Sequence, residues 1–139
     1  MPDNSENLEI ITNNDAIWAI IIRATFHKEG IEFFTPDSFS QQIGYMSHKA
    51  GHNIQPHHHK SAMREITDTQ EVLLIKYGKL RVDFYEANNE VFKSIFLYKG
   101  DLILLAKGGH GFHVEEDTAM IEIKQGPYLG INDKNKFEI

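Results

Sequence analysis

The chain has 139 residues, a formal net charge of −6 and no cysteine. This length predicts a single domain with a sizeable hydrophobic core, and the absence of cysteine excludes disulfides, thiolate metal sites and cysteine nucleophiles. The negative net charge and the absence of any cluster of basic residues argue against nucleic acid or an anionic membrane as partner. The first residues do not resemble a secretory signal and no apolar run has the length of a membrane helix, so we expect a cytoplasmic protein.

Short apolar runs separated by turn residues begin at residue 15. Residues 15–26 are dense in isoleucine, and their β-branched side chains favour a strand buried on both faces. Residues 31–35 and 42–50 are predicted as the next two strands. The ends of the chain lack this pattern, so we expect one domain with its core at about residues 15–126 and with peripheral arms at 1–14 and 127–139.

The next stretch, residues 51–66, carries three consecutive histidines and is predicted to be extended. His57 and His59 would then lie on one face of a strand and His58 on the other, whereas a helix would separate the first two by roughly 200°. Glu71 begins the following strand. Two imidazoles and a carboxylate from neighbouring strands are typical of a site for a divalent transition metal. A surface-exposed histidine cluster is the alternative interpretation.

The second half of the chain shows the clearest alternation. Strands are predicted at residues 71–77, 79–85, 91–98, 102–105, 110–116 and 119–124. Nine or ten short strands at this spacing, with almost no helical periodicity, predict an all-β sandwich or barrel. The residues expected to face its core include Leu80, Val82, Phe84, Leu102, Leu104, Phe112, Val114, Ile121 and Ile123.

Two late histidines are further possible ligands. On an extended strand His110 shares a face with Phe112 and Val114 and should point inward, whereas His113 should point outward. His110 is therefore the expected third histidine of the metal site. A core histidine bonded to a backbone carbonyl remains the alternative for His110, and a surface position is the preferred interpretation of His113.

These spacings resemble the two motifs of the cupin superfamily. The first is Gly51, five residues, His57-x-His59, and then Glu71, six residues and Gly78; the second runs from Gly100-Asp101 to Gly108-Gly109-His110-Gly111-Phe112. The resemblance covers about residues 43–124. It implies a small antiparallel jelly-roll barrel, with a divalent metal held by His57, His59, Glu71 and His110.

The sequence departs from the cupin pattern in two places. Eleven residues separate His59 from Glu71, where the family usually has three or four, and Glu65 is a rival ligand inside this gap. The second motif lacks its usual proline, with Ala106 near that place, and is one residue short before His110. The first departure implies an extended hairpin, in which Glu71 is the preferred ligand because it has the six-residue spacing to Gly78, and the second shifts the depth of His110.

A site of three histidines and one glutamate suits Fe, Mn, Ni, Co or Zn. As a Lewis acid, the metal would support isomerisation or epimerisation of a small molecule, or oxygen-dependent cleavage if it is iron. The wider pattern resembles small cupins of polysaccharide or nucleotide-sugar metabolism, which implies a sugar derivative as substrate. The alternatives are a module that binds a small molecule or metal without turnover, and a purely structural jelly roll. Glu65, Tyr45 and Tyr77 are the available candidates for a general base, but no spacing singles one out and a structural role is the preferred interpretation of each.

A homodimer is expected from the apolar run at residues 16–22. If this strand lay at the outside of the sheet, it would expose a large apolar patch on a monomer. Isologous pairing of two copies would cover that patch.

Overall fold

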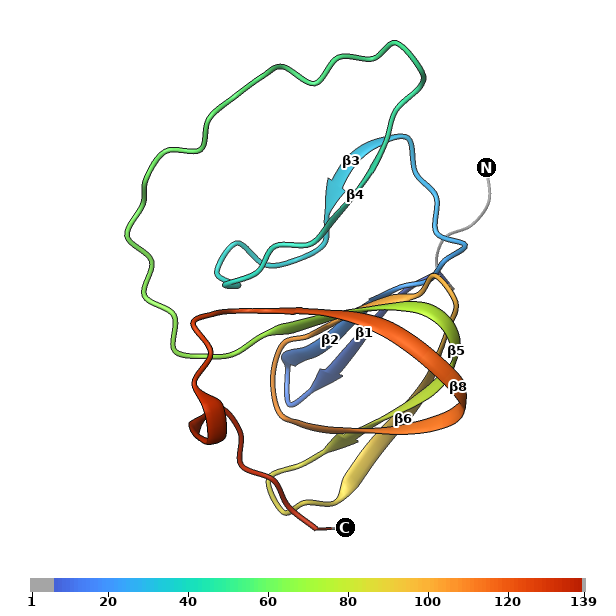
Figure 1. Ribbon diagram of the computed structural model, residues 1–139, viewed down its shortest axis with the longest axis vertical. Helices are drawn as coiled ribbons and strands as arrows, with labels where there is room; N and C mark the ends of the chain where they lie inside the picture. The colour runs from blue at the N-terminus through green and yellow to red at the C-terminus, as the bar shows by residue number, and fades with distance from the viewer. Residues whose placement is uncertain (1–6, 139) are drawn as a thin grey trace.

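The computed structural model describes residues 7–138, and its regular elements are almost entirely β-strands (Figure 1). The strands are β1 (Leu8–Asn13), β2 (Ala16–Ile22), β3 (Gly30–Phe33), β4 (Gly44–Ser47), β5 (Glu71–Tyr85), β6 (Val91–Tyr98), β7 (Leu102–Leu105) and β8 (Gly109–Lys124). One short 3₁₀ helix, η1 (Gly130–Asn132), follows. The prediction of an all-β chain is confirmed. Within the described residues no helix is long and apolar enough to cross a membrane.

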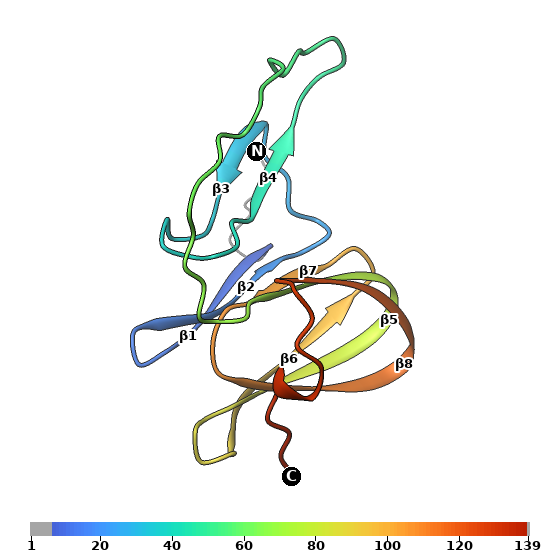
Figure 2. The ribbon, with the colours of Figure 1, turned by 60° about the vertical axis from the view of Figure 1, so that its left-hand side comes forward.

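Six strands form one curled antiparallel sheet, in the order β1-β2-β7-β5-β6, with β8 also paired to β5. β5 organises this sheet: its first half pairs with β7 and the end of β8, and its second half pairs with β6 and the start of β8. β5 and β8 therefore curl together, and the sheet takes the form of a half-barrel (Figures 1 and 2). β3 and β4 form a separate hairpin that projects from this body.

β5 and β8 are each one long strand, where the sequence predicts two shorter strands separated by a turn. The strands continue because irregularities in their pairing, around Tyr77 and Lys79, absorb the bend. Gly78 lies at this bend with φ +102°, and a Cβ there would collide with the backbone of Asp117 and Thr118. The glycine thus permits a sharply curved ladder instead of ending the strand.

Gly78→Ala is expected to lower the free energy of unfolding by about 2–4 kcal/mol, because it combines backbone strain at positive φ with a steric collision. Gly30→Ala is the matched control, since Gly30 has φ +86° but nothing within 4 Å of an added Cβ. The control should lose only about 1–2 kcal/mol from strain. Urea unfolding of both variants measures the difference, and equal losses would contradict close packing of β8 against Gly78.

The core consists of two clusters on opposite faces of the sheet, one with Leu80, Val82 and Phe84 and the other with Ile20, Val72 and Leu104, and it agrees in part with the predicted alternation. Leu80, Val82, Phe84 and Leu104 are buried as predicted, and Leu102 is partly buried. The four predicted core residues on β8 are exposed instead: Phe112, Val114, Ile121 and Ile123. These β8 residues lack a cover because no second layer of strands packs against them among the described residues.

The apolar run at residues 16–22 is not an outer strand. It forms β2, which lies between β1 and β7, and Ala19, Ile20 and Ile21 are fully buried within the chain. β1 comes from residues that the sequence placed at the periphery of the domain, and it pairs with the edge of β2 that was expected to be exposed. Residues 1–6 of the same predicted segment lie outside the described part. The argument for a homodimer from an exposed strand at 16–22 is therefore wrong.

Residues 48–69 form a long excursion that we call the arm, and every one of them is exposed. The arm leaves the β3–β4 hairpin, passes far from the half-barrel and returns at the start of β5 (Figures 1 and 2). The prediction of a strand at residues 51–66 is wrong for this structure. A strand needs a paired neighbour to satisfy its backbone groups, and none of the described strands pairs with the arm.

Asp83 is a buried carboxylate near the end of β5. It accepts hydrogen bonds from Arg81 Nε at 3.0 Å and from Ser94 Oγ at 2.6 Å. Burial by itself would raise the pKa of Asp83, but the bonds from Ser94 and Arg81 outweigh it and hold the pKa below its usual value of 3.8. Because the folded pKa is depressed, the stabilisation is present above pH 3.8 and is lost as the pH falls through the folded pKa.

Asp83→Asn is accordingly expected to lower the free energy of unfolding by about 1–2 kcal/mol at pH 7, a modest figure because Arg81 is solvent-exposed. The difference from the wild type should shrink as the pH is lowered toward 3. Glu115→Gln, which removes the more exposed carboxylate that Arg81 contacts at 3.3 Å, should have a smaller effect. Urea unfolding across this pH range would contradict the assignment if the Asp83→Asn difference were constant.

Candidate functional site

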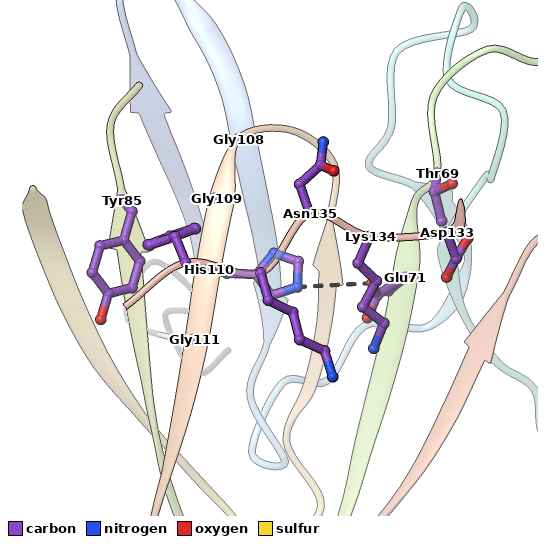
Figure 3. Close-up of a pocket in the computed structure, with 12 residues that line it drawn as sticks. Thr69, Glu71, Tyr85, Gly108, Gly109, His110, Gly111, Asp133, Lys134 and Asn135 are labelled. Atoms are coloured by element: carbon purple, nitrogen blue, oxygen red, sulfur yellow. Dashed lines mark ion pairs between the residues drawn. The ribbon is translucent and has the colours of Figure 1, made fainter. Parts of the chain in front are cut away.

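A cavity of about 470 Å³ opens where β5 and β8 begin. Its walls come from the start of β5, the start of β8 and the C-terminal segment at residues 133–137 (Figure 3). The residues that line it are Thr69, Glu71, Tyr85, Gly108, Gly109, His110, Gly111, Asp133, Lys134, Asn135, Lys136 and Phe137. The glycines at 108, 109 and 111 allow close packing of this wall, because a Cβ at Gly108 would meet Trp18 and one at Gly109 or Gly111 would meet Tyr85.

Glu71 and His110 face each other in this cavity, and His110 Nε2 lies 3.8 Å from Glu71 Oε1 (Figure 3). Their side chains are only 15% and 24% exposed. Glu71 is the first residue of β5 and His110 is the second residue of β8, so neighbouring backbone pairing does not bring them together: His110 is paired with Phe84 and Glu71 with Lys124. The curl of the two strands carries the start of β8 back to the start of β5.

The cavity disfavours charge on both side chains. Burial is the main cause that raises the pKa of Glu71, and the neighbouring carboxylate of Glu122 raises it further against the opposing effect of Lys124. Burial likewise lowers the pKa of His110, with Lys134 acting in the same direction and Glu122 against it. A neutral imidazole is the form that binds metals, and a buried carboxyl next to a second carboxylate gains from a nearby cation.

The C-terminal segment closes one side of the cavity. Lys124 Nζ lies 3.1 Å from Asp133 Oδ2 and 3.6 Å from Glu122 Oε1, and Phe137 packs edge-to-face on Tyr85 with ring centroids 5.1 Å apart. The sequence predicted that residues 127–139 lie at the periphery of the domain. These contacts show instead that part of this segment forms a wall of the cavity. Alternation along residues 119–124 puts Glu122 and Lys124 on one face, and this signal pointed to their proximity.

The other two predicted ligands lie outside the cavity. His57 and His59 are on the exposed arm, with ring centroids 5.2 Å apart, and His57 Nδ1 contacts the carbonyl oxygen of Gln55 at 2.8 Å. The structure thus brings together Glu71 and His110 and leaves the histidine pair apart from them. Within residues 7–138 no group of three or more His, Cys, Asp or Glu side chains is placed so that it could hold a metal ion.

The rival ligands and the expected general bases also lie elsewhere. Glu65 is exposed on the arm, near the loop between β3 and β4. His113 is exposed, with its Nε2 3.9 Å from Glu115 Oε1. Neither Tyr45 nor Tyr77 lines the cavity that holds Glu71 and His110.

Tyr85 is the tyrosine in the wall of this cavity, and the sequence did not predict it as a site residue. The signal available for it was its position at the end of the strand that Glu71 begins.

This arrangement supplies one oxygen and one nitrogen donor beside a cationic wall formed by Lys134 and Lys136. It suits a cation at the carboxylate and an anionic or hydroxyl-rich molecule at the lysines. The cupin resemblance of the two motifs remains a prediction from the sequence. Comparisons of this chain with protein-family models, with curated proteins and with solved structures found no match, and so none of them assigns it to a family.

Proposed function

We propose that this chain is a metal-binding jelly-roll protein that acts on a small polar metabolite, with one divalent transition metal held by His57, His59, Glu71 and His110. The half-barrel would be the larger part of the jelly roll, and the arm would supply its remaining strand. The metal would act as a Lewis acid on a carbonyl or hydroxyl group of the bound molecule.

The observation that carries the proposal is the contact between Glu71 and His110. Metal–ligand bonds of about 2.0–2.2 Å keep two donors of one metal within about 4.4 Å of each other. The separation of 3.8 Å between Glu71 Oε1 and His110 Nε2 satisfies this limit. The two residues come from separate sequence motifs, and the sequence predicts both as ligands.

The cavity also supports the proposed class of substrate. Its volume of about 470 Å³ falls within the range of roughly 300–1,000 Å³ typical of small-molecule sites. Lys134 and Lys136 on one wall favour a phosphate or carboxylate group, and Asn135 and Tyr85 offer hydrogen bonds to hydroxyls. A phosphorylated sugar or a nucleotide-sugar combines these features.

The metal is tested by elemental analysis of the purified protein and two matched variants. We expect about one divalent metal per chain in the wild type. His59→Ala should remove it, whereas the neighbouring His58→Ala should leave it largely in place, because adjacent residues on a strand point to opposite faces. Metal retained in His59→Ala, or lost equally in both variants, would overturn the proposed ligand set.

Turnover is tested separately with the metal-loaded protein. Sugar phosphates and nucleotide-sugars are incubated with it and followed by NMR for isomerised, epimerised or oxidised products. Binding without product for every compound would show a metal-containing binding module and would contradict the proposed enzymatic activity.

A further inference from the structure

The outer edge of β8 has no partner among the strands that the structure describes. β8 runs for 16 residues, and among the described strands it pairs only with β5. Its exposed apolar side chains are Phe112, Val114, Met120, Ile121 and Ile123. A long free edge beside exposed apolar residues is a surface that stable β-proteins normally cover.

The arm has the properties of a missing strand. It is extended, all of residues 48–69 are exposed, and Ile54, Met63 and Ile66 are among its exposed apolar side chains. The hydrogen bonds described for its residues are local, from His52 N to the carbonyl oxygen of Lys49 and between His57 and Gln55. Within residues 7–138 of a single copy, the arm and the edge of β8 therefore both carry backbone groups and apolar surface for which the structure describes no strand partner.

Their charges are complementary. Residues 48–64 of the arm contain Lys49, Lys60 and Arg64 and no acidic residue. β8 contains Glu115, Glu116, Asp117 and Glu122 against one lysine, Lys124. The basic stretch of the arm and the acidic strand would attract each other, and opposite charges on neighbouring strands stabilise their pairing.

The path of the chain favours a second copy over the arm's own β8. The arm starts from the projecting end of the β3–β4 hairpin and heads away from the half-barrel (Figures 1 and 2). The hairpin is fixed in that direction by four paired residues in each strand and by the edge-to-face packing of Tyr45 on Phe26, with ring centroids 5.0 Å apart. The end of the arm, at residues 65–68, lies against β2, but residues 51–59 would have to fold back from the path they take in the structure to pair with β8 of the same chain.

We infer that the arm pairs with the outer edge of β8 in a second copy of this chain, and that the exchange is mutual. This inference rests on the proposed function for one consequence: His57 and His59 of one copy would join Glu71 and His110 of the other to complete each metal site. A two-fold arrangement satisfies both unpaired edges at once.

The length of the arm agrees with such an exchange. Eleven residues lie between His59 and Glu71. An extended chain of this length spans up to about 40 Å, enough for His59 to reach a site on a neighbouring molecule while Glu71 stays in its own half-barrel. The long gap that departs from the cupin motif would supply this reach.

Crosslinking tests the docking without reference to any metal. Antiparallel pairing that puts His57 beside His110 also puts Asn53 beside Val114. The chain has no cysteine, so Asn53→Cys and Val114→Cys introduce the only thiols. The two single variants, one carrying a mass tag, are refolded together and treated with a short bismaleimide, and a crosslinked tagged–untagged pair is expected.

The chain with both substitutions identifies the route of the arm. Mutual exchange predicts a covalent dimer, whereas an arm folded onto its own β8 gives a crosslinked monomer and overturns the inference. An absence of crosslinks in both experiments, or a monomer by light scattering, also overturns it. Crosslinked dimers that bind no metal would refute the proposed function alone, and a metal-binding monomer would refute the exchange alone.

Mixing two defective chains tests the shared site directly. His59→Ala and His110→Ala should each bind no metal, but a mixed dimer contains one intact arm and one intact cavity that meet each other. Random refolding of the two should restore about a quarter of the wild-type metal content per chain. If each site is built within one chain, the mixture stays empty.

Discussion

Replacing Asp101 by alanine is expected to lower the free energy of unfolding by about 2–4 kcal/mol, because it removes a buried acceptor of two backbone N–H groups and one of the carboxylates that contact Arg23. Asp101 is 4% exposed. Its carboxylate lies 3.0 Å from Arg23 Nη1 and accepts hydrogen bonds from the backbone N–H of Ala24 at 2.9 Å and of Tyr98 at 2.8 Å. The carboxylate thereby fixes the turn between β6 and β7 to the end of β2.

Glu9→Gln is the control for this prediction. Glu9 contacts the same guanidinium, at 3.1 Å from Arg23 Nη2, but its side chain is 36% exposed. Solvent screens that contact, so the loss should be below about 1 kcal/mol. Urea unfolding at pH 7 measures both variants. Similar losses for the two would show that burial does not set the contribution of Asp101.

His110→Ala should weaken metal binding by at least about 100-fold, since removing a ligand costs no less than removing one of its hydrogen-bond partners. His113→Ala is the matched control, because His113 lies on the same strand but its side chain is 59% exposed. The control should keep the wild-type affinity. Titration calorimetry of the metal-free proteins gives both constants.

Thermal unfolding supplies a second readout for the His110 variant. A metal that binds only the folded chain stabilises the wild type by about 2.7 kcal/mol when present at 100 times its dissociation constant. His110→Ala should lose this increment and still unfold cooperatively without metal, since its imidazole is partly exposed. A metal-induced shift that survives in His110→Ala and vanishes in His113→Ala would reverse the assignment of the inward face of β8.

Alternation within single strands was readable from the sequence. The pattern at residues 79–85 predicted the burial of Leu80, Val82 and Phe84 correctly, because the side-chain period of a strand is local geometry. Motif spacing also selected Glu71 and His110, which the structure places 3.8 Å apart. Both residues stand in local patterns that the sequence shows directly: Glu71 begins a strand, and His110 follows the glycine turn at residues 108–109.

Pairing between distant segments was not readable. The run at residues 16–22 is apolar on both faces, but only the tertiary structure decides that β1 and β7 flank it. Phe112 and Val114 alternate as core residues do, yet they are exposed because the face of β8 has no cover. The pattern of a strand records which face is apolar and contains no information about which segment covers it.

The sequence by itself determined that this chain is all-β, with strands at most of their observed positions, and it determined which donor residues stand at strand ends. The tertiary structure decided that β5 and β8 are continuous, that their curl joins Glu71 to His110, and that residues 133–137 close the cavity. It also decided that His57 and His59 stand on an exposed arm. The physical reason is that side-chain alternation is local, whereas strand pairing and curvature depend on contacts between segments far apart in the chain.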